Sequence, residues 1–225
     1  MSKGWGLGLL AGAALALPGA ALHAGFQSGF DVRFTAGGNY NSGADLESDN
    51  GFPVDGSFAL YGDLGADYGN AAGFVLGLDL LNGPNRSHPF RDVAGANTYT
   101  GTISVANLGL FLAPGWRVRL ADRVVLEARL GLGAIAAKES FETDGFGTAT
   151  ATGYGYGVWP EFRGEYELGS WGLGLSVGYL ASLVPALEDS NGQVVQNTQA
   201  TYATLRTEGF STGLSVAYHF SPLLN

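Results

Sequence analysis

The chain of 225 residues contains no cysteine, and only 11 of its residues are lysine or arginine. Without cysteine there is no disulfide bond, no thiolate nucleophile and no cysteine metal ligand. The formal net charge is −9 and no stretch is basic, which argues against nucleic-acid binding. No segment is apolar over the roughly 20 residues that a membrane-spanning helix requires.

The N-terminal segment has the pattern of a secretory leader. Lys3 supplies a positive start, residues 7–17 form a short apolar run, and Pro18 and Gly19 end it. Small residues follow, and the run is too short to cross a bilayer. The pattern predicts a signal peptide over residues 1–24, with cleavage after Ala24.

Near the end of the sequence, small and large side chains alternate from one residue to the next. Between residues 209 and 220, serine, glycine and alanine alternate with larger apolar side chains, a period of two that is typical of a β-strand. The apolar members of this series are Phe210, Leu214, Val216, Tyr218 and Phe220. Because the same alternation recurs along the chain, its 37 glycines indicate close-packed strands rather than low complexity.

The alternation predicts an all-β protein with eight strands. They are expected at residues 28–38, 56–68, 73–81, 102–119, 123–137, 153–167, 171–183 and 205–220. Three connections are short (69–72, 120–122 and 168–170), and four are long and polar (39–55, 82–101, 138–152 and 184–204). Short turns alternating with long loops are typical of an antiparallel, up-and-down transmembrane β-barrel. The barrel would occupy residues 25–220, with 221–225 as a short tail and a β-bulge near Ala106, where the apolar phase of the fourth strand changes.

One face of the strands is apolar, and the other combines glycine with charged residues. A soluble, lipocalin-like barrel would turn the charged face to water, but such a face normally carries lysine, and Lys138 is the only lysine after the predicted leader. The aromatics at the strand ends suggest two girdles at the membrane interfaces. They are Tyr68, Phe74, Trp116, Tyr154, Tyr156, Tyr166, Trp171, Tyr179, Tyr218 and Phe220.

This pattern resembles the small eight-stranded outer-membrane proteins of the OmpA/OmpX and OmpW type, over the whole chain after the leader. The resemblance implies a place in the outer membrane of a Gram-negative cell envelope, with long loops outside the cell and both termini in the periplasm. It also implies contact with outer-membrane lipid and lipopolysaccharide, and insertion by the barrel-assembly machinery, which reads a terminal aromatic. The five residues after Phe220 depart from that pattern. Oligomeric state is left open.

Charged residues on the second face would point into the lumen. They are Asp31, Arg33, Asp63, Asp79, Arg117, Arg119, Glu127, Arg129, Glu161, Arg163 and Glu165. Eight strands leave room for little besides side chains, and an unpaired buried charge costs several kcal/mol. A plug of salt bridges is therefore expected, with an ion path or a proton relay as the alternative.

The sequence predicts no enzyme, no cofactor and no metal site. Ser87, His88 and Asp92 could form a triad at the barrel rim, but this segment also suits an ordinary loop. His219 and Ser215 share a face, yet four residues of strand separate them by about 13 Å, beyond the reach of a nucleophile and its base. The acidic residues 45–55 could suit calcium, but they lack the complete EF-hand spacing.

Three functions are consistent with these features. The first is a structural or surface-interaction barrel. The alternatives are a narrow, porin-like channel for ions or small solutes and a lipid-modifying enzyme.

Overall fold

The computed structural model describes residues 28–41, 57–70, 72–83, 86–94, 97–145, 147–195 and 204–220. The predicted signal peptide, the acidic segment 45–55 and the tail 221–225 lie outside the described residues. The strands are β1 (Ser28–Asn41), β2 (Ser57–Asn70), β3 (Gly73–Asn82), β4 (Arg86–Ala94), β5 (Asn97–Ala121), β6 (Val124–Thr143), β7 (Gly147–Leu168), β8 (Trp171–Val184), β9 (Glu188–Asp189) and β10 (Leu205–His219). No helix within these ranges is long and apolar enough to cross a membrane.

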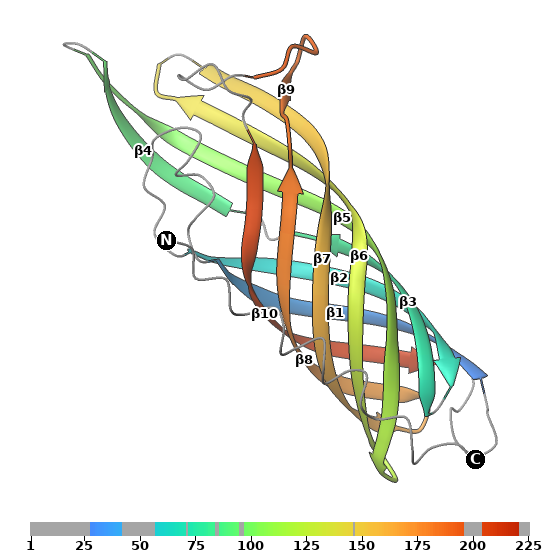
Figure 1. The fold of residues 1–225 in the computed structure, drawn as a ribbon. Coiled ribbons are helices and arrows are strands. Elements are labelled where there is room, and N and C mark those ends of the chain that lie inside the picture. The colour runs from blue at the N-terminus through green and yellow to red at the C-terminus, as the bar shows by residue number, and fades with distance from the viewer. Residues whose placement is uncertain are drawn as a thin grey trace, which may run out of the picture.

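Eight of the strands close into a ring (Figure 1). The order β3-β2-β1-β10-β8-β7-β6-β5 is completed by pairing between β3 and β5, and every neighbouring pair is antiparallel. The first and last strands meet with Asp31 opposite His219. Closure lets strands satisfy their backbone hydrogen bonds within the ring, as a bilayer demands. The prediction of an eight-stranded antiparallel barrel is confirmed.

The two ends of the barrel differ. At the turn end, tight connections join β2 to β3, β5 to β6 and β7 to β8. At the opposite, loop end, β5, β6 and β7 run on past the other strands of the ring (Figure 1). The long strands have 25, 20 and 22 residues, whereas β1, β2 and β8 have 14 each.

The predicted loop 82–101 is wrong in its central part, because β4 forms there and pairs with the start of β5. β4 stands at an edge of the sheet, where Pro89 is tolerated although it lacks a backbone N–H. Sequence reasoning missed this strand because it lacks the apolar alternation of the lipid-facing strands. His88, which was expected in a loop, lies in β4 opposite Ile103.

The predicted loop 138–152 is also largely strand. β6 continues to Thr143 and β7 begins at Gly147, so the connection is a tight turn through Asp144 and Gly145. Gly145 has a φ of +82°, which favours glycine. The backbone N–H of Asp144 donates to the carbonyl of Thr100 at 2.9 Å, which fastens this turn to β5.

The predicted loop 184–204 contains the short strand β9, which pairs with β7. Its Asp189 carboxylate accepts hydrogen bonds from the backbone N–H groups of Gln193 and Asn191, at 2.9 and 2.8 Å. These bonds hold the pKa of the Asp189 carboxyl below its ordinary value.

The bulge predicted near Ala106 is absent from the β5–β6 register, which runs without a shift from Gly101 to Arg119. The described irregularity lies at the turn end, between Arg119 and Ala121. Ile103 and Val105 do not change phase; they lie on the same face of β5 as the inward-pointing Phe111 and Arg117, and each is 3% exposed. The prediction failed because it assumed that Ile103 and Val105 share the outer face with Leu108 and Leu110.

The outer surface of the ring is apolar and the inside is polar. Leu60 is 71% exposed on the outside, whereas Arg33 is 1% exposed in the lumen. Aromatic pairs mark the turn end, where Trp171 and Tyr218 have ring centroids 4.9 Å apart and Phe220 lies 5.1 Å from Tyr218. This inverted distribution suits a barrel whose solvent is lipid.

Candidate functional site in the barrel lumen

The charged lumen network comprises the eleven predicted residues together with Asp67, Glu167 and His219. Strand periodicity places all of them inside, because side chains alternate between lumen and lipid. Most are buried, and Arg119 and Glu165 are half-buried. Counted over these members, eight carboxyl groups face five guanidinium groups.

Arg33 of β1 binds the acids of the next two strands. Its guanidinium nitrogens lie 2.5 Å from an oxygen of Asp67, 2.7 Å from Asp79 and 3.5 Å from Asp63. Arg33 lies opposite Gly65 of β2, which in turn lies opposite Asp79 of β3, so the arginine side chain crosses β2 to reach β3. The planar fork of arginine suits such multiple carboxylate contacts.

Arg129 joins this group to the opposite wall. It lies 2.6 Å from Glu161, 3.0 Å from Asp67, 3.1 Å from Glu127 and 3.2 Å from Asp79. The same carboxylate oxygen of Glu161 that binds Arg129 also accepts a hydrogen bond from Arg163 at 2.7 Å. Acids from β2, β3, β6 and β7 thus share one central arginine.

Arg117 extends the group toward the turn end. It lies 2.8 Å from Glu127 and 2.9 Å from Asp31. The structure therefore brings together all the predicted lumen charges except Arg119 and Glu165, which lie nearer the mouth. Asp67, missing from the prediction, contacts four arginines. Its position four residues after Asp63 on the same strand face is the signal that would have found it.

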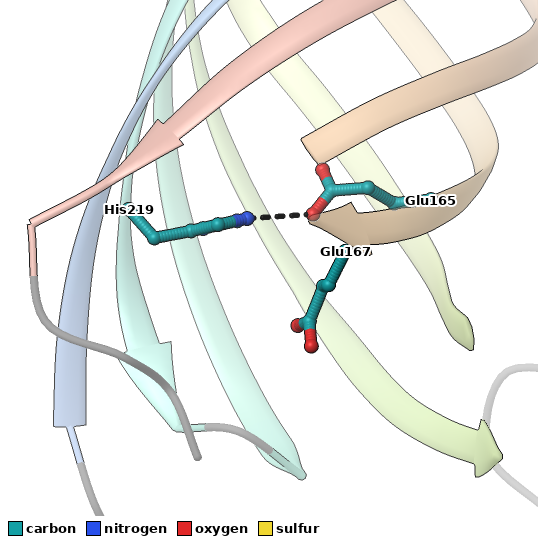
Figure 2. Close-up of side chains that lie close together, drawn as sticks. All are labelled: Glu165, Glu167 and His219. Carbon is teal, nitrogen blue, oxygen red and sulfur yellow. Dashed lines mark ion pairs between the residues drawn. The ribbon is translucent and has the colours of Figure 1, made fainter. Parts of the chain in front are cut away.

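The mouth of the lumen at the turn end holds a second group (Figure 2). The imidazole of His219 has Nδ1 2.7 Å from Asp31 and Nε2 2.9 Å from Glu165. Glu167 lies beside them and is paired with Arg119 at 2.5 Å. Sequence reasoning placed His219 in the lumen but missed its partners, because they come from β1 and β7.

Lumenal glycines make room for the arginines. A Cβ on Gly65 would lie 2.4 Å from a nitrogen of Arg33, and one on Gly77 would lie 2.7 Å from a nitrogen of Arg129. These distances are shorter than normal contacts. The glycine richness of the inner face is thus partly explained by the bulk of the guanidinium groups.

An apolar layer lies above the charges, toward the loop end. Trp159 packs edge-on against Phe111 and Tyr61, with centroids 5.8 and 6.0 Å away, and its indole N–H donates to Ser211 at 3.2 Å. Further apolar side chains continue the layer: Leu81, Val105, Ile135, Ala137, Leu180, Val184, Leu187 and Leu205. The gap between Trp159 and Asn39 has no room for a water molecule.

Two layers therefore fill the lumen: a layer of ion pairs and, toward the loop end, a layer of packed apolar side chains. The apolar layer was not predicted, although Phe111 and Trp159 stand at inward positions of their strands. Of the possible triad at the rim, Ser87 Oγ lies 3.1 Å from Ser104 Oγ across the β4–β5 pair. The side chains of His88 and Asp92 lie outside the described part of the structure.

A closed antiparallel ring of eight strands, apolar outside and charged inside, defines a transmembrane β-barrel of the small outer-membrane class. No known protein family matches the chain, and no curated protein matches it.

Solved structures of outer-membrane proteins are similar to it in outline. Ail of Yersinia pestis, in complex with the heparin analogue sucrose octasulfate, is 13% identical and has a TM-score of 0.45, covering 87% of this chain and 99% of Ail. Neisserial surface protein A is 12% identical, with a TM-score of 0.45 over 86% and 99% of the two chains. A major outer membrane protein from Thermus thermophilus is 14% identical, with a TM-score of 0.45 over 86% and 100%.

Proposed function

We propose that this chain is an integral outer-membrane protein with a structural or surface-interaction role. Its filled lumen serves as a rigid scaffold, and the loop end presents the interacting surface outside the cell. The observation that carries the proposal is that ion pairs and packed apolar side chains both block the lumen. Partners can therefore reach only the two rims and the lipid-facing wall.

The ion pairs disfavour the channel alternative. A permeating ion would have to replace arginine–carboxylate contacts of 2.5–3.2 Å that link β1, β2, β3, β5, β6 and β7 across the lumen. Above them, the contacts of Trp159 with Tyr61 and Phe111 block the same path with apolar bulk. Separating such buried charges costs several kcal/mol for each ion left without a partner.

The shape of the loop end favours surface interaction. β5, β6 and β7 extend past the rest of the ring, and β4 adds a further strand to this extension (Figure 1). Exposed or half-buried acids there include Glu142, Asp144 and Glu188. Such a surface suits cationic groups, or lipopolysaccharide phosphates bridged by divalent cations.

The orientation is testable because the chain has no cysteine. Glu188→Cys places one thiol at the loop end, and the matched Ser170→Cys places one at the turn end; both positions are exposed. On intact cells, a membrane-impermeant maleimide should label the first variant, and should label the second only after lysis. The reverse pattern would refute the proposed topology.

The closed lumen is tested by planar-bilayer recording of the purified barrel in potassium chloride. We expect no stable conductance steps above the bare bilayer. Reproducible steps would support the channel instead. The proposal also assigns no catalysis, so lipid A mass spectra should be the same with and without the gene.

A further inference from the structure

We propose that the mouth of the lumen at the turn end is a binding site for one divalent first-row transition-metal cation, with Zn²⁺ the favoured ion. Its ligands are His219, Glu165 and Glu167 (Figure 2). One donor atom from each lies within 4.8 Å of the other two. This site is separate from the proposed surface role.

The contacts of His219 point to a cation. Nδ1 lies 2.7 Å from Asp31 and Nε2 lies 2.9 Å from Glu165. A protonated imidazole has two N–H groups and can donate to both of these carboxylates. A metal cation at Nε2 would take the place of the second proton, while Nδ1–H still donates to Asp31.

The direction of Nε2 is independent evidence. His219 is 4% exposed, and its Nε2 forms an ion pair with Glu165 at 2.9 Å (Figure 2). The nitrogen is thus buried and directed at the carboxylate of Glu165, with Glu167 beside it. Such convergence suits ligands that share a metal.

Asp31 has the position of a supporting residue. A metal-bound histidine normally donates its other N–H to a carboxylate, which fixes the ring and its tautomer. Asp31 accepts from that side of His219 and is held in place by Arg117 at 2.9 Å. Glu167 can bind a cation through one carboxylate oxygen while Arg119 keeps the other.

The donor set and the charge select the type of cation. One imidazole nitrogen and two carboxylates suit Zn²⁺, whereas Ca²⁺ and Mg²⁺ prefer oxygen ligands alone. At the mouth itself, the carboxyl groups of Asp31, Glu165 and Glu167 lie close to His219, a concentration of acids that suits a divalent cation. The side chains of Glu165 and Glu167 are 12% and 10% exposed, so ions can enter from the turn end.

The test uses the full barrel in detergent, without an affinity tag and after treatment with a chelator. Calorimetric titration with Zn²⁺ should give one ion per chain, and Co²⁺ should give visible absorption bands typical of nitrogen and oxygen ligation. His219→Gln and Glu165→Gln should abolish both signals. Asp31→Asn should weaken binding by about 10–100-fold, as loss of a supporting carboxylate does at other sites.

His88→Gln is the matched control, because it removes the other histidine that follows the predicted leader, and it should bind like the original protein. Heat-modifiable mobility on a gel checks that each variant is folded. If His219→Gln does not fold, Glu165→Gln and Glu167→Gln decide, since both positions lie nearer to solvent. Absence of stoichiometric binding, or binding unchanged in the folded variants, would overturn the site; so would loss of binding in His88→Gln alone.

Discussion

Single residues in this lumen depend on partners from distant parts of the sequence. Glu161 is an example: one of its oxygens lies 2.6 Å from Arg129 and 2.7 Å from Arg163, and the residue is 3% exposed. Removing its charge would leave the buried guanidinium of Arg163 with no carboxylate oxygen of the described residues closer than 3.6 Å, which is its distance from Glu127. In a dry site, the penalty for an uncompensated buried charge is large.

We therefore expect Glu161→Gln to lower the free energy of unfolding by about 3–5 kcal/mol. Urea unfolding in detergent, followed by tryptophan fluorescence, measures this change. Glu188→Gln, at an exposed position of the loop end, should be nearly neutral. If Glu161→Gln is equally neutral and the barrel begins to conduct ions, then the lumen is hydrated.

Glycine also acts at the scale of one residue. A Cβ on Gly133 would lie 2.1 Å from the carbonyl oxygen of Leu110, a backbone atom of the neighbouring strand that cannot move aside alone. On Gly62 the nearest such atom is 4.0 Å away. Gly133→Ala should therefore destabilise the barrel by about 1–3 kcal/mol, as overpacking does. Gly62→Ala should have little effect, and similar midpoints for the two variants would show that the β5–β6 spacing is looser than described.

Among the elements, β4 differs from the ring strands because it pairs with β5 beyond the segment that closes the barrel. The barrel closes where β3 pairs with residues 108–117 of β5, whereas β4 pairs with residues 97–105 of the same strand. The two pairings are therefore separable. The β4–β5 hairpin is an addition to the barrel rather than part of its ring.

Replacing residues 86–104 with Asn-Gly, which favours a turn within the shortened loop between Asn82 and Leu108, should thus leave a folded barrel. The buried Ile103 is lost with the hairpin, so a small fall in the unfolding midpoint is expected. Heat-modifiable gel mobility and circular dichroism check the outcome. Failure to fold would show that β4 is required for closure.

On the scale of the whole molecule, the apolar outer surface of the barrel requires lipid rather than water as its surroundings. Large apolar side chains such as Leu175 (65% exposed) and Phe210 (63%) cover the outside, which would be unstable in water. The protein should therefore stay in the membrane pellet after extraction with high salt or carbonate, while a soluble periplasmic marker is released. Recovery of native protein in the soluble periplasmic fraction would contradict this prediction.

The sequence by itself determined the class of fold, because a period of two is a local property. Eight alternating segments with three short turns were enough to predict the ring, and alternation alone placed Arg33, Glu127 and Glu161 inside. Neighbouring strands joined by short turns could also be paired, as Arg117 and Glu127 are across β5 and β6.

The tertiary structure decided which distant residues meet and what fills the lumen. Closure of β1 on β10 brings Asp31 to His219 across 188 residues of sequence, and no local pattern contains that contact. The ring also places Phe111, Trp159 and Tyr61 in one layer, although each strand read alone shows only an isolated inward aromatic. The physical reason is that strand periodicity fixes the side of each residue, whereas the register around a closed ring fixes its height and its partners.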